Sequence, residues 1–251
     1  FNTIPNVSKT NESNEYGNLG NAYLSIGNVE KAMASYNESL KVDPNNFYTH
    51  NNLGKAYTMQ GRLSKAINEF NVAIKLNPDY WETFYNLGLV YMRSGQFSDG
   101  EKALLDARNL APQESQIYFS LGNIYQKMKL FDNSLVSYKN YLSLAGENWK
   151  GPFQIGNVFS KLGRFENAIQ EYRKSKKLNP KHTQTLINLG NAYSKINKPS
   201  LALKEYLLAL SLNLKDPLFH QNIGILYARK DFYHPAKAVY HLQKSLELDP
   251  D

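Results

Sequence analysis

The chain has 251 residues, a formal net charge of +7 and no cysteine. The lack of cysteine excludes disulfide bonds and metal sites built from thiolates. No apolar run reaches the roughly 18 residues that a membrane-spanning helix needs, so no membrane span is predicted. The excess of positive charge favours an acidic partner without naming it.

The N-terminal segment precedes the regular part of the sequence. Residues 2–14 are rich in Asn, Ser and Thr and include Pro5. Such clusters next to a periodic segment are typical of loops. We therefore predict an N-terminal linker over residues 1–12.

A strict period of 34 residues follows. Seven glycines mark it, at Gly20, Gly54, Gly88, Gly122, Gly156, Gly190 and Gly224. A fixed period of this length indicates a stack of structural repeats. Such stacks bind partners along an extended surface and rarely carry chemistry. The predicted repeats start at residues 13, 47, 81, 115, 149, 183 and 217, and together they span residues 13–251.

The second repeat shows what each unit contains. Apolar and small residues recur at helical spacing over His50–Tyr57 and again, after Gly61, over Leu63–Ile74. Spacings of i, i+3, i+4 and i+7 predict an amphipathic helix in each stretch. Pro78 ends the second helix, because proline disfavours helical geometry in the residue before it. Each repeat is therefore predicted to be a hairpin of two helices, helix A and helix B.

The position of a residue is counted from the first residue of its repeat. The seven glycines all lie at position 8. A glycine inside a helix costs about 1 kcal/mol relative to alanine. Its recurrence predicts that a larger side chain would block the close approach of helices A and B. Position 11 is aromatic in every repeat and is predicted to fill the space beside this contact.

Two places depart from the regular repeat. Repeat four ends at Gly146 instead of a proline, and repeat five has Pro152 in its first turn, where a missing N–H costs little. We expect a local irregularity over residues 145–152. Repeat seven needs two extra residues between its helices, within Asp231–Pro235.

The last helix B carries four apolar residues, and no further repeat follows in this sequence to cover them. They are Val239, Leu242, Leu246 and Leu248. An uncovered apolar surface tends to be used for association. We expect that the natural chain continues past Asp251, or that this end is buried against another molecule, for example by self-association.

The repeat resembles the tetratricopeptide repeat, TPR, over residues 13–251. The family motif has a small residue at position 8, an aromatic at 11, alanine at 20, an aromatic at 24, a small residue at 27 and proline at 32. Repeat two carries it as Gly54, Tyr57, Ala66, Phe70, Ala73 and Pro78. The resemblance implies an all-α, right-handed superhelical solenoid of seven antiparallel helix hairpins. The pentatricopeptide RNA readers are the nearest alternative, and the unbroken 34-residue interval argues against them.

Helix A leaves one face free for a partner. Positions 4, 7, 8 and 11 cluster on one side of the helix. Positions 2, 5, 6, 9, 12 and 13 point the opposite way and form what we call the inner face. In TPR proteins this face lines the concave groove where peptides bind. Asparagine recurs there, at position 6 as Asn18, Asn52, Asn86, Asn188 and Asn222, and at position 9 as Asn21, Asn123, Asn157 and Asn191.

These asparagine columns exceed chance, because 29 of the 251 residues are asparagine and only about one in seven is expected at a given position. A carboxamide offers a donor and an acceptor, so a column of them can bind the backbone of an extended peptide. The columns resemble the asparagine ladder in the TPR superhelix of the glycosyltransferase that attaches N-acetylglucosamine to Ser and Thr. Ser120 and Gln154 interrupt the position-6 column. Alternatively, the amides of positions 6 and 9 bridge adjacent helices A.

Position 13 is basic in five consecutive repeats, as Arg93, Lys127, Lys161, Lys195 and Arg229. With Lys55 and Lys150, these cations share the inner face with a single acid, Glu82. This balance favours acidic residues in the ligand. Position 13 also lies in the last turn of helix A, where a cation offsets the helix dipole. Both roles stay open.

Two other kinds of ligand fit the inner face less well. The carboxylate clamp that binds chaperone tails needs a cation at position 5, and no repeat has one there. Nucleic-acid binding needs aromatic platforms for base stacking. The inner face offers four such residues, Tyr48, Tyr85, Phe119 and Phe153.

The sequence contains no HExxH motif, phosphate loop or nucleophile elbow. His50 and His220 occupy position 4, a packing position, and are predicted to be buried. We therefore predict no enzymatic activity, no cofactor, no metal site and no small-molecule substrate. The predicted function is a scaffold or adaptor that binds an extended, partly acidic peptide. The alternative is the substrate-recruiting TPR arm of a larger enzyme such as a glycosyltransferase.

Overall fold

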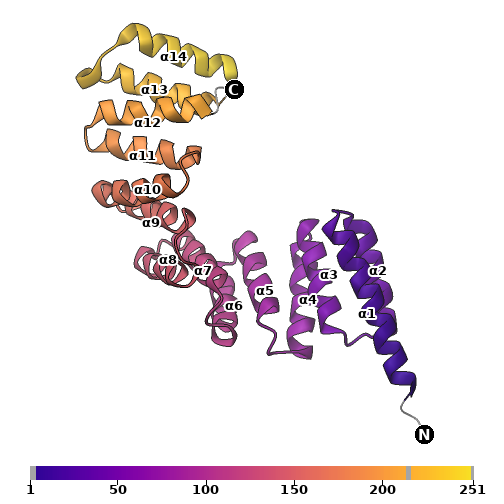
Figure 1. Ribbon diagram of the computed structural model, residues 1–251. Coiled ribbons are helices and arrows are strands. Elements are labelled where there is room, and N and C mark those ends of the chain that lie inside the picture. Colours follow the sequence, from indigo (N-terminus) through magenta and orange to yellow (C-terminus); the bar gives the residue numbers. More distant parts are fainter. Residues whose placement is uncertain (1–3, 213–215, 250–251) are drawn as a thin grey trace. The chain divides into compact units, whose positions relative to one another are not determined.

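The computed structural model describes residues 4–212 and 216–249 (Figure 1). This part of the chain contains fourteen α-helices, one 3-10 helix and no strand. The α-helices are α1 (Ile4–Ser25), α2 (Val29–Val42), α3 (Phe47–Met59), α4 (Leu63–Leu76), α5 (Trp81–Arg93), α6 (Phe97–Leu110), α7 (Ser115–Lys127), α8 (Phe131–Ala145), α9 (Lys150–Lys161), α10 (Phe165–Leu178), α11 (Thr183–Lys195), α12 (Pro199–Leu212), α13 (Pro217–Ala228) and α14 (Pro235–Leu248).

The helices form two compact units, the first ending at Leu130 and the second beginning at Phe131. The first unit contains the hairpins α1–α2, α3–α4 and α5–α6, followed by α7. The second begins with α8 and continues with the hairpins α9–α10, α11–α12 and α13–α14. Within a unit, one helix A also contacts the next, as α1 contacts α3 and α9 contacts α11. The predicted all-α fold is confirmed, and the predicted antiparallel helix pairs are found within each unit.

The glycine at position 8 lies against the side chain at position 24. A Cβ atom on Gly54 would lie 2.7 Å from Cε1 of Phe70, and one on Gly156 would lie 2.6 Å from Cδ1 of Tyr172. Both distances are too short for carbon atoms in van der Waals contact. The predicted close approach of helices A and B is confirmed, and the ring at position 24 occupies the space that glycine leaves.

The core of each unit lies between successive hairpins. In the first unit Ala66, Phe70, Leu87 and Val90 form one cluster that joins repeats two and three, and all four are at most 6% exposed. Burying a large apolar side chain such as Phe70 contributes about 1.5–3 kcal/mol. A single hairpin cannot bury both of its faces, so neighbouring hairpins complete the core.

Position 15 joins helix A to helix B in left-handed backbone conformation. Gly61 and Gly163 have φ values of 74° and 72° there, in a region that favours glycine. Lys129 and Asn197 occupy the same position with φ values of 61° and 57°. Asparagine tolerates this region, whereas lysine is strained in it.

The N-terminal segment differs from the predicted linker. Helix α1 begins at Ile4, so residues 4–12 are helical and continue into helix A of repeat one. Pro5 stands at the second helical position, where the backbone N–H has no partner within the helix. Ser13, which is fully buried, donates to the carbonyl oxygen of Ser39 at 3.1 Å and fixes this helix to α2. Residues 1–3 lie outside the described residues.

The two predicted irregularities are confirmed. Helix α8 has 15 residues, one more than α10, and Gly146, which follows its last residue, has a φ of 70°. Oδ1 of Asn148 then accepts hydrogen bonds from the backbone N–H groups of Lys150 and Gly151 at 3.1 and 3.2 Å, which caps α9. In repeat seven a 3-10 helix over Lys230–Phe232 separates α13 from α14.

Candidate functional site

In the first unit, the inner-face asparagines bridge neighbouring helices A. Asn52 of α3 donates from Nδ2 to Oδ1 of Asn21 of α1 at 2.9 Å. The hydroxyl of Tyr36 donates to the same oxygen at 2.8 Å. Asn86 of α5 donates to Oδ1 of Asn51 at 3.1 Å. Asn51, at position 5, replaces the position-9 partner because position 9 of repeat two is a lysine.

The same arrangement recurs in the second unit. Nδ2 of Asn188 donates to Oδ1 of Asn157 at 2.8 Å, and the hydroxyl of Tyr172 donates to that oxygen at 2.9 Å. In repeat six the hydroxyl of Tyr206 donates to Oδ1 of Asn191 at 2.6 Å. The alternative in which the amides bridge adjacent helices A is therefore confirmed for the pairs Asn52–Asn21 and Asn188–Asn157.

The sequence analysis did not predict that tyrosines at position 24 bind these amides, as Tyr36, Tyr172 and Tyr206 do. Position 24 is tyrosine in the four repeats with asparagine at position 9, as Tyr36, Tyr138, Tyr172 and Tyr206. In the other three repeats it is Phe70, Leu104 and Leu242. The joint occurrence of asparagine at position 9 and tyrosine at position 24 is the sequence pattern that indicates these hydrogen bonds. Burial raises the pKa of Tyr36, Tyr172 and Tyr206 to about 12, so these hydroxyls stay protonated and act as donors at neutral pH.

Some donor and acceptor groups of the inner-face asparagines make no hydrogen bond among the described residues. Among the described residues, Nδ2 of Asn21 and Nδ2 of Asn191 have no acceptor, although their oxygens are occupied. The side chains of Asn18 and Asn222 have no partner in the same part of the chain. Asn18, Asn21 and Asn191 are exposed, and Asn222 is half-buried. Asn123 lies half-buried on α7.

The two residues that interrupt the position-6 column also make hydrogen bonds. The hydroxyl of Ser120 donates to the hydroxyl oxygen of Tyr85 at 3.3 Å. Oε1 of Gln154 accepts from Nδ2 of Asn157 at 3.0 Å. Both side chains are thus hydrogen-bonded to residues of helices A.

The two arginines at position 13 cap the helix A of the preceding repeat. Arg93 donates from Nη1 to the carbonyl oxygen of Thr58 at 2.9 Å, and Arg229 donates to that of Ser194 at 2.9 Å. Arg229 also forms an ion pair with Asp231 at 2.8 Å. These contacts place each guanidinium at the negative end of a neighbouring helix dipole. A structural role of the two arginines is therefore evident.

The position-13 lysines stand at the C-terminal ends of three other helices A. Lys127, Lys161 and Lys195 are exposed at the ends of α7, α9 and α11. The inner-face acid Glu82 lies 3.9 Å from Nζ of Lys55, so its charge is partly balanced. The inner face therefore keeps a positive character.

A cleft of about 340 Å³ opens on the inner face of the second unit. Asn191 and Lys195 of α11 and Asn222 of α13 line it, together with Tyr206 and Ile225. Ile225 is 54% exposed, which gives the cleft an apolar contact surface beside its amides. Members of both asparagine columns and of the basic column thus meet in one cavity.

The two histidines at position 4 contact neighbouring side chains, but His50 is half-buried instead of buried as predicted. Nδ1 of His50 lies 2.7 Å from the carboxylate of Glu69, and Nδ1 of His220 lies 3.0 Å from Nδ1 of His241. His220 is 7% exposed, as predicted for position 4. Within the described ranges no group of three His, Cys, Asp or Glu residues could hold a metal ion. None of the helices described is long and apolar enough to cross a membrane.

The predicted apolar surface of the last helix is exposed in part. Val239 and Leu246 are 53% and 64% exposed, whereas Leu242 packs against Gly224. Leu248 is half-buried. Self-association through this surface stays a prediction.

Sequence profiles of a known repeat family match most of the chain. A profile described as "TPR repeat" matches residues 20–61, 55–95 and 156–197, and one described as "Tetratricopeptide repeat" matches residues 115–148 and 183–216. No curated protein sequence matches the chain.

Solved structures share its fold. PilF of Pseudomonas aeruginosa is 18% identical, with a TM-score of 0.74 over 89% of this chain and 100% of that chain. A tetratricopeptide repeat protein of Parabacteroides merdae is 12% identical, with a TM-score of 0.73 over 95% and 94% of the two chains. YrrB, described as a TPR protein with an unusual peptide-binding site, is 20% identical, with a TM-score of 0.59 over 72% and 93%. Repeats of this kind mediate protein–protein interactions, and this chain belongs to the tetratricopeptide repeat family.

Proposed function

We propose that the inner face binds an extended, partly acidic peptide and that the protein acts as a scaffold or adaptor. One observation carries this proposal. Unpaired amide groups of Asn191 and Asn222 line the same cleft as the exposed ammonium group of Lys195. These are the groups needed to bind a peptide backbone and a carboxylate.

Each residue of the cleft has a distinct role in this proposal. Nδ2 of Asn191 donates to a peptide carbonyl, while its oxygen stays bound to Tyr206, which fixes the orientation of the amide. Asn222 offers both a donor and an acceptor. Lys195 pairs with an acidic side chain, and Ile225 contacts an apolar one. A preoriented amide loses little conformational freedom on binding, which favours affinity.

The first unit offers a comparable set of groups on α1. Asn18 and Nδ2 of Asn21 are exposed and unpaired among the described residues. We assign direct peptide contact to these two residues, and a positioning role to Asn52, which orients Asn21 through its 2.9 Å bond.

The remaining predicted site residues also have different roles, some positioning helices and others supplying charge. Asn86, Asn157 and Asn188 position neighbouring helices through the amide bonds described above. The lysines at position 13 supply positive charge along the face, and we keep Lys127 and Lys161 in that role. For Arg93 and Arg229 the helix-capping bonds come first, so we expect them to affect stability more than binding.

A binding experiment can test the cleft directly. Peptides that the full chain retains from a random library would be mapped and then titrated against Asn191→Ala/Asn222→Ala. We expect the double substitution to weaken binding about tenfold, because each lost hydrogen bond is worth about 0.5–1.5 kcal/mol. A recruiting arm of a larger enzyme would use the same cleft, so this expectation holds for either role.

A matched control is available on the same unit. Asn167 is an exposed asparagine of α10 that does not line the cleft. Asn167→Ala should leave the affinity unchanged. Equal affinities for the double variant, the control variant and the unaltered chain would rule out peptide binding at this cleft.

A further inference from the structure

A second positively charged surface lies on α10 and the helices that follow it. Residues 171–205 include eight lysines and arginines and two glutamates, so this short segment carries most of the excess charge of the chain. Four of the cations lie within Arg173–Lys177 on α10, which is a helix B. The inner face therefore does not account for them.

A cleft of about 460 Å³ lies between α10 and α12. Arg173 and Lys177 of α10 and Lys204 of α12 line it, and all three are exposed. Leu201 of α12, which is 41% exposed, and the half-buried Tyr193 of α11 contribute apolar lining together with the buried Leu189. The cleft thus combines cationic walls with an apolar interior.

The acid that lines this cleft is already paired. Glu205 is 6% exposed, and its two carboxylate oxygens accept hydrogen bonds from Nζ of Lys176 at 2.9 and 2.7 Å. Arg173, Lys177 and Lys204 have no acidic partner among the residues that the structure describes. Three cations consequently remain available to a negatively charged ligand.

Helix stability does not explain all of these cations. Lys177 lies in the last turn of α10, where a cation is favourable. Arg173 lies before that turn, and Lys204 lies in the first half of α12, where the helix dipole gives a cation no advantage. A role in binding gives a reason for their presence.

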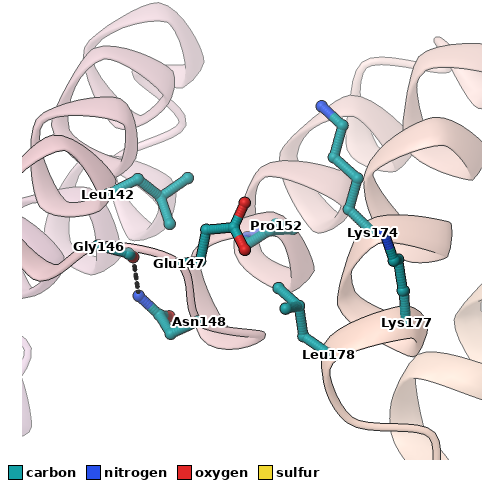
Figure 2. Close-up of a pocket in the computed structure, with 8 residues that line it drawn as sticks. All are labelled: Leu142, Gly146, Glu147, Asn148, Pro152, Lys174, Lys177 and Leu178. Carbon is teal, nitrogen blue, oxygen red and sulfur yellow. Dashed lines mark hydrogen bonds between the residues drawn. The ribbon is translucent and has the colours of Figure 1, made fainter.

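A second cavity, of about 580 Å³, lies on the other side of α10. It is lined by Leu142, Glu147, Pro152, Lys174, Lys177 and Leu178, among others (Figure 2). Figure 2 shows the two lysines extending from α10 on one side, with Glu147 between them and the end of α8. Because Lys177 lines both cavities, α10 forms a basic ridge between two partly apolar hollows.

We propose that the cleft between α10 and α12 is a second binding site, which takes a peptide segment that combines acidic residues with an apolar side chain. The acidic residues pair with Arg173, Lys177 and Lys204, and the apolar side chain contacts Leu201 and Tyr193. A nucleic acid would use the cations but not the apolar lining, of which Leu201 offers no ring on which a base could stack. The site lies outside the inner face and is independent of the function proposed above.

The test uses the full chain and a fluorescent peptide of alternating glutamate and leucine, with binding followed by anisotropy. The chain carries Asn191→Ala/Asn222→Ala throughout, so that the inner-face cleft does not contribute. Arg173→Gln/Lys177→Gln/Lys204→Gln should weaken binding about tenfold, since three charge pairs are lost. The control Lys75→Gln/Lys102→Gln/Lys139→Gln removes the same charge from exposed positions on other helices B and should change binding by less than about twofold.

Two further probes separate the sources of affinity. Leu201 lines the cleft and is 41% exposed, so Leu201→Ser should not unfold the chain. It should weaken binding of the glutamate–leucine peptide and leave a glutamate–glycine peptide unaffected. An equal loss of peptide affinity in the Arg173→Gln/Lys177→Gln/Lys204→Gln variant and in the control variant would overturn the proposal. A single-stranded oligonucleotide that binds more tightly than the peptide, and is released by the cleft variant, would overturn it in favour of a nucleic-acid surface.

Discussion

The hydroxyl of Tyr172 donates a 2.9 Å hydrogen bond to Oδ1 of Asn157, and so connects helix B of repeat five to an amide on the inner face. The same oxygen accepts a bond from the following repeat, through Asn188. One carboxamide thus joins three helices, α9, α10 and α11. Changes to the buried hydroxyl should therefore affect both stability and the order of the binding face.

We predict that Tyr172→Phe lowers the free energy of unfolding by about 0.5–1.5 kcal/mol, because one buried hydrogen bond is lost while the ring still fills its space. Urea denaturation would measure this change. The control is Tyr240→Phe, whose ring is 60% exposed and which should leave stability unaltered. Equal stability of both variants would show that the Tyr172–Asn157 bond contributes nothing.

Two asparagines of the same column should respond differently to substitution. Asn188 bridges to Asn157, so Asn188→Ala should cost about 1 kcal/mol of stability. Asn222 has no partner among the described residues, so Asn222→Ala should leave the melting temperature unchanged and weaken peptide binding instead. Thermal denaturation and a peptide titration of both variants would check this. The reverse pattern would contradict the division into positioning and contacting residues.

A buried hydroxyl without a partner marks a site where stability can be gained. Thr83 is fully buried, and its Oγ1 makes no hydrogen bond among the described residues. The equivalent Thr49 lies 2.8 Å from the hydroxyl of Ser39, whereas the residue at that position before Thr83 is Ala73. We predict that Thr83→Val raises the free energy of unfolding by about 1 kcal/mol and that Thr49→Val lowers it by a similar amount. Urea denaturation of both variants decides the matter, and a loss in each would mean that Thr83 has a partner.

Acid should weaken repeat seven. Burial and the charge of Lys244 lower the pKa of His220 below its ordinary 6.5, and burial together with His220 lowers the pKa of His241. Below pH 6.5 the unfolded chain therefore binds protons that the folded repeat does not, so the free energy of unfolding falls as the pH drops. Amide hydrogen exchange in α13 and α14, followed from about pH 7.5 to about pH 5, should show this loss of protection.

His50 provides the opposite case in the first unit. Burial opposes its charge, but hydrogen bonds to Glu69 and to the carbonyl of Pro44 outweigh that effect and raise its pKa. Its contribution to stability is present below pH 6.5 and is lost as the pH rises through the raised value. Exchange in α3 and α4 should accordingly not accelerate over the range in which α13 and α14 lose protection. Parallel acceleration in both units would contradict these assignments.

The hairpins followed from the sequence because glycine, aromatic and proline positions recur in every repeat, and local helix geometry turns that recurrence directly into packing. The partners of inner-face side chains were harder to predict. Asn188 and Asn157 are 31 residues apart, and Arg93 and Thr58 are 35 apart, so each pairing depends on how one repeat is placed against the next. Periodicity locates the faces of a helix, but it does not state which side chain of a neighbouring repeat lies within 3 Å.

The sequence did contain one signal for these partners. Tyrosine at position 24 accompanies asparagine at position 9, as in the pair Tyr206 and Asn191, and the two meet because the ring of helix B crosses beneath the glycine of helix A. Considering two columns together would have found the pair. The basic cluster on α10 lies on a helix B, outside the inner-face positions, so the pattern of helix A does not predict it.

Among the described residues, the hydrogen bonds between neighbouring helices A run in one direction along the chain. In the pairs Asn52–Asn21, Asn188–Asn157 and Arg93–Thr58, the donor belongs to the later repeat and the acceptor to the earlier one. An earlier helix A is thus capped only once its successor has folded. During synthesis, a repeat therefore reaches its full stability only after the next repeat has emerged and folded. Under mechanical force, a unit should unfold more readily from its last hairpin than from its first.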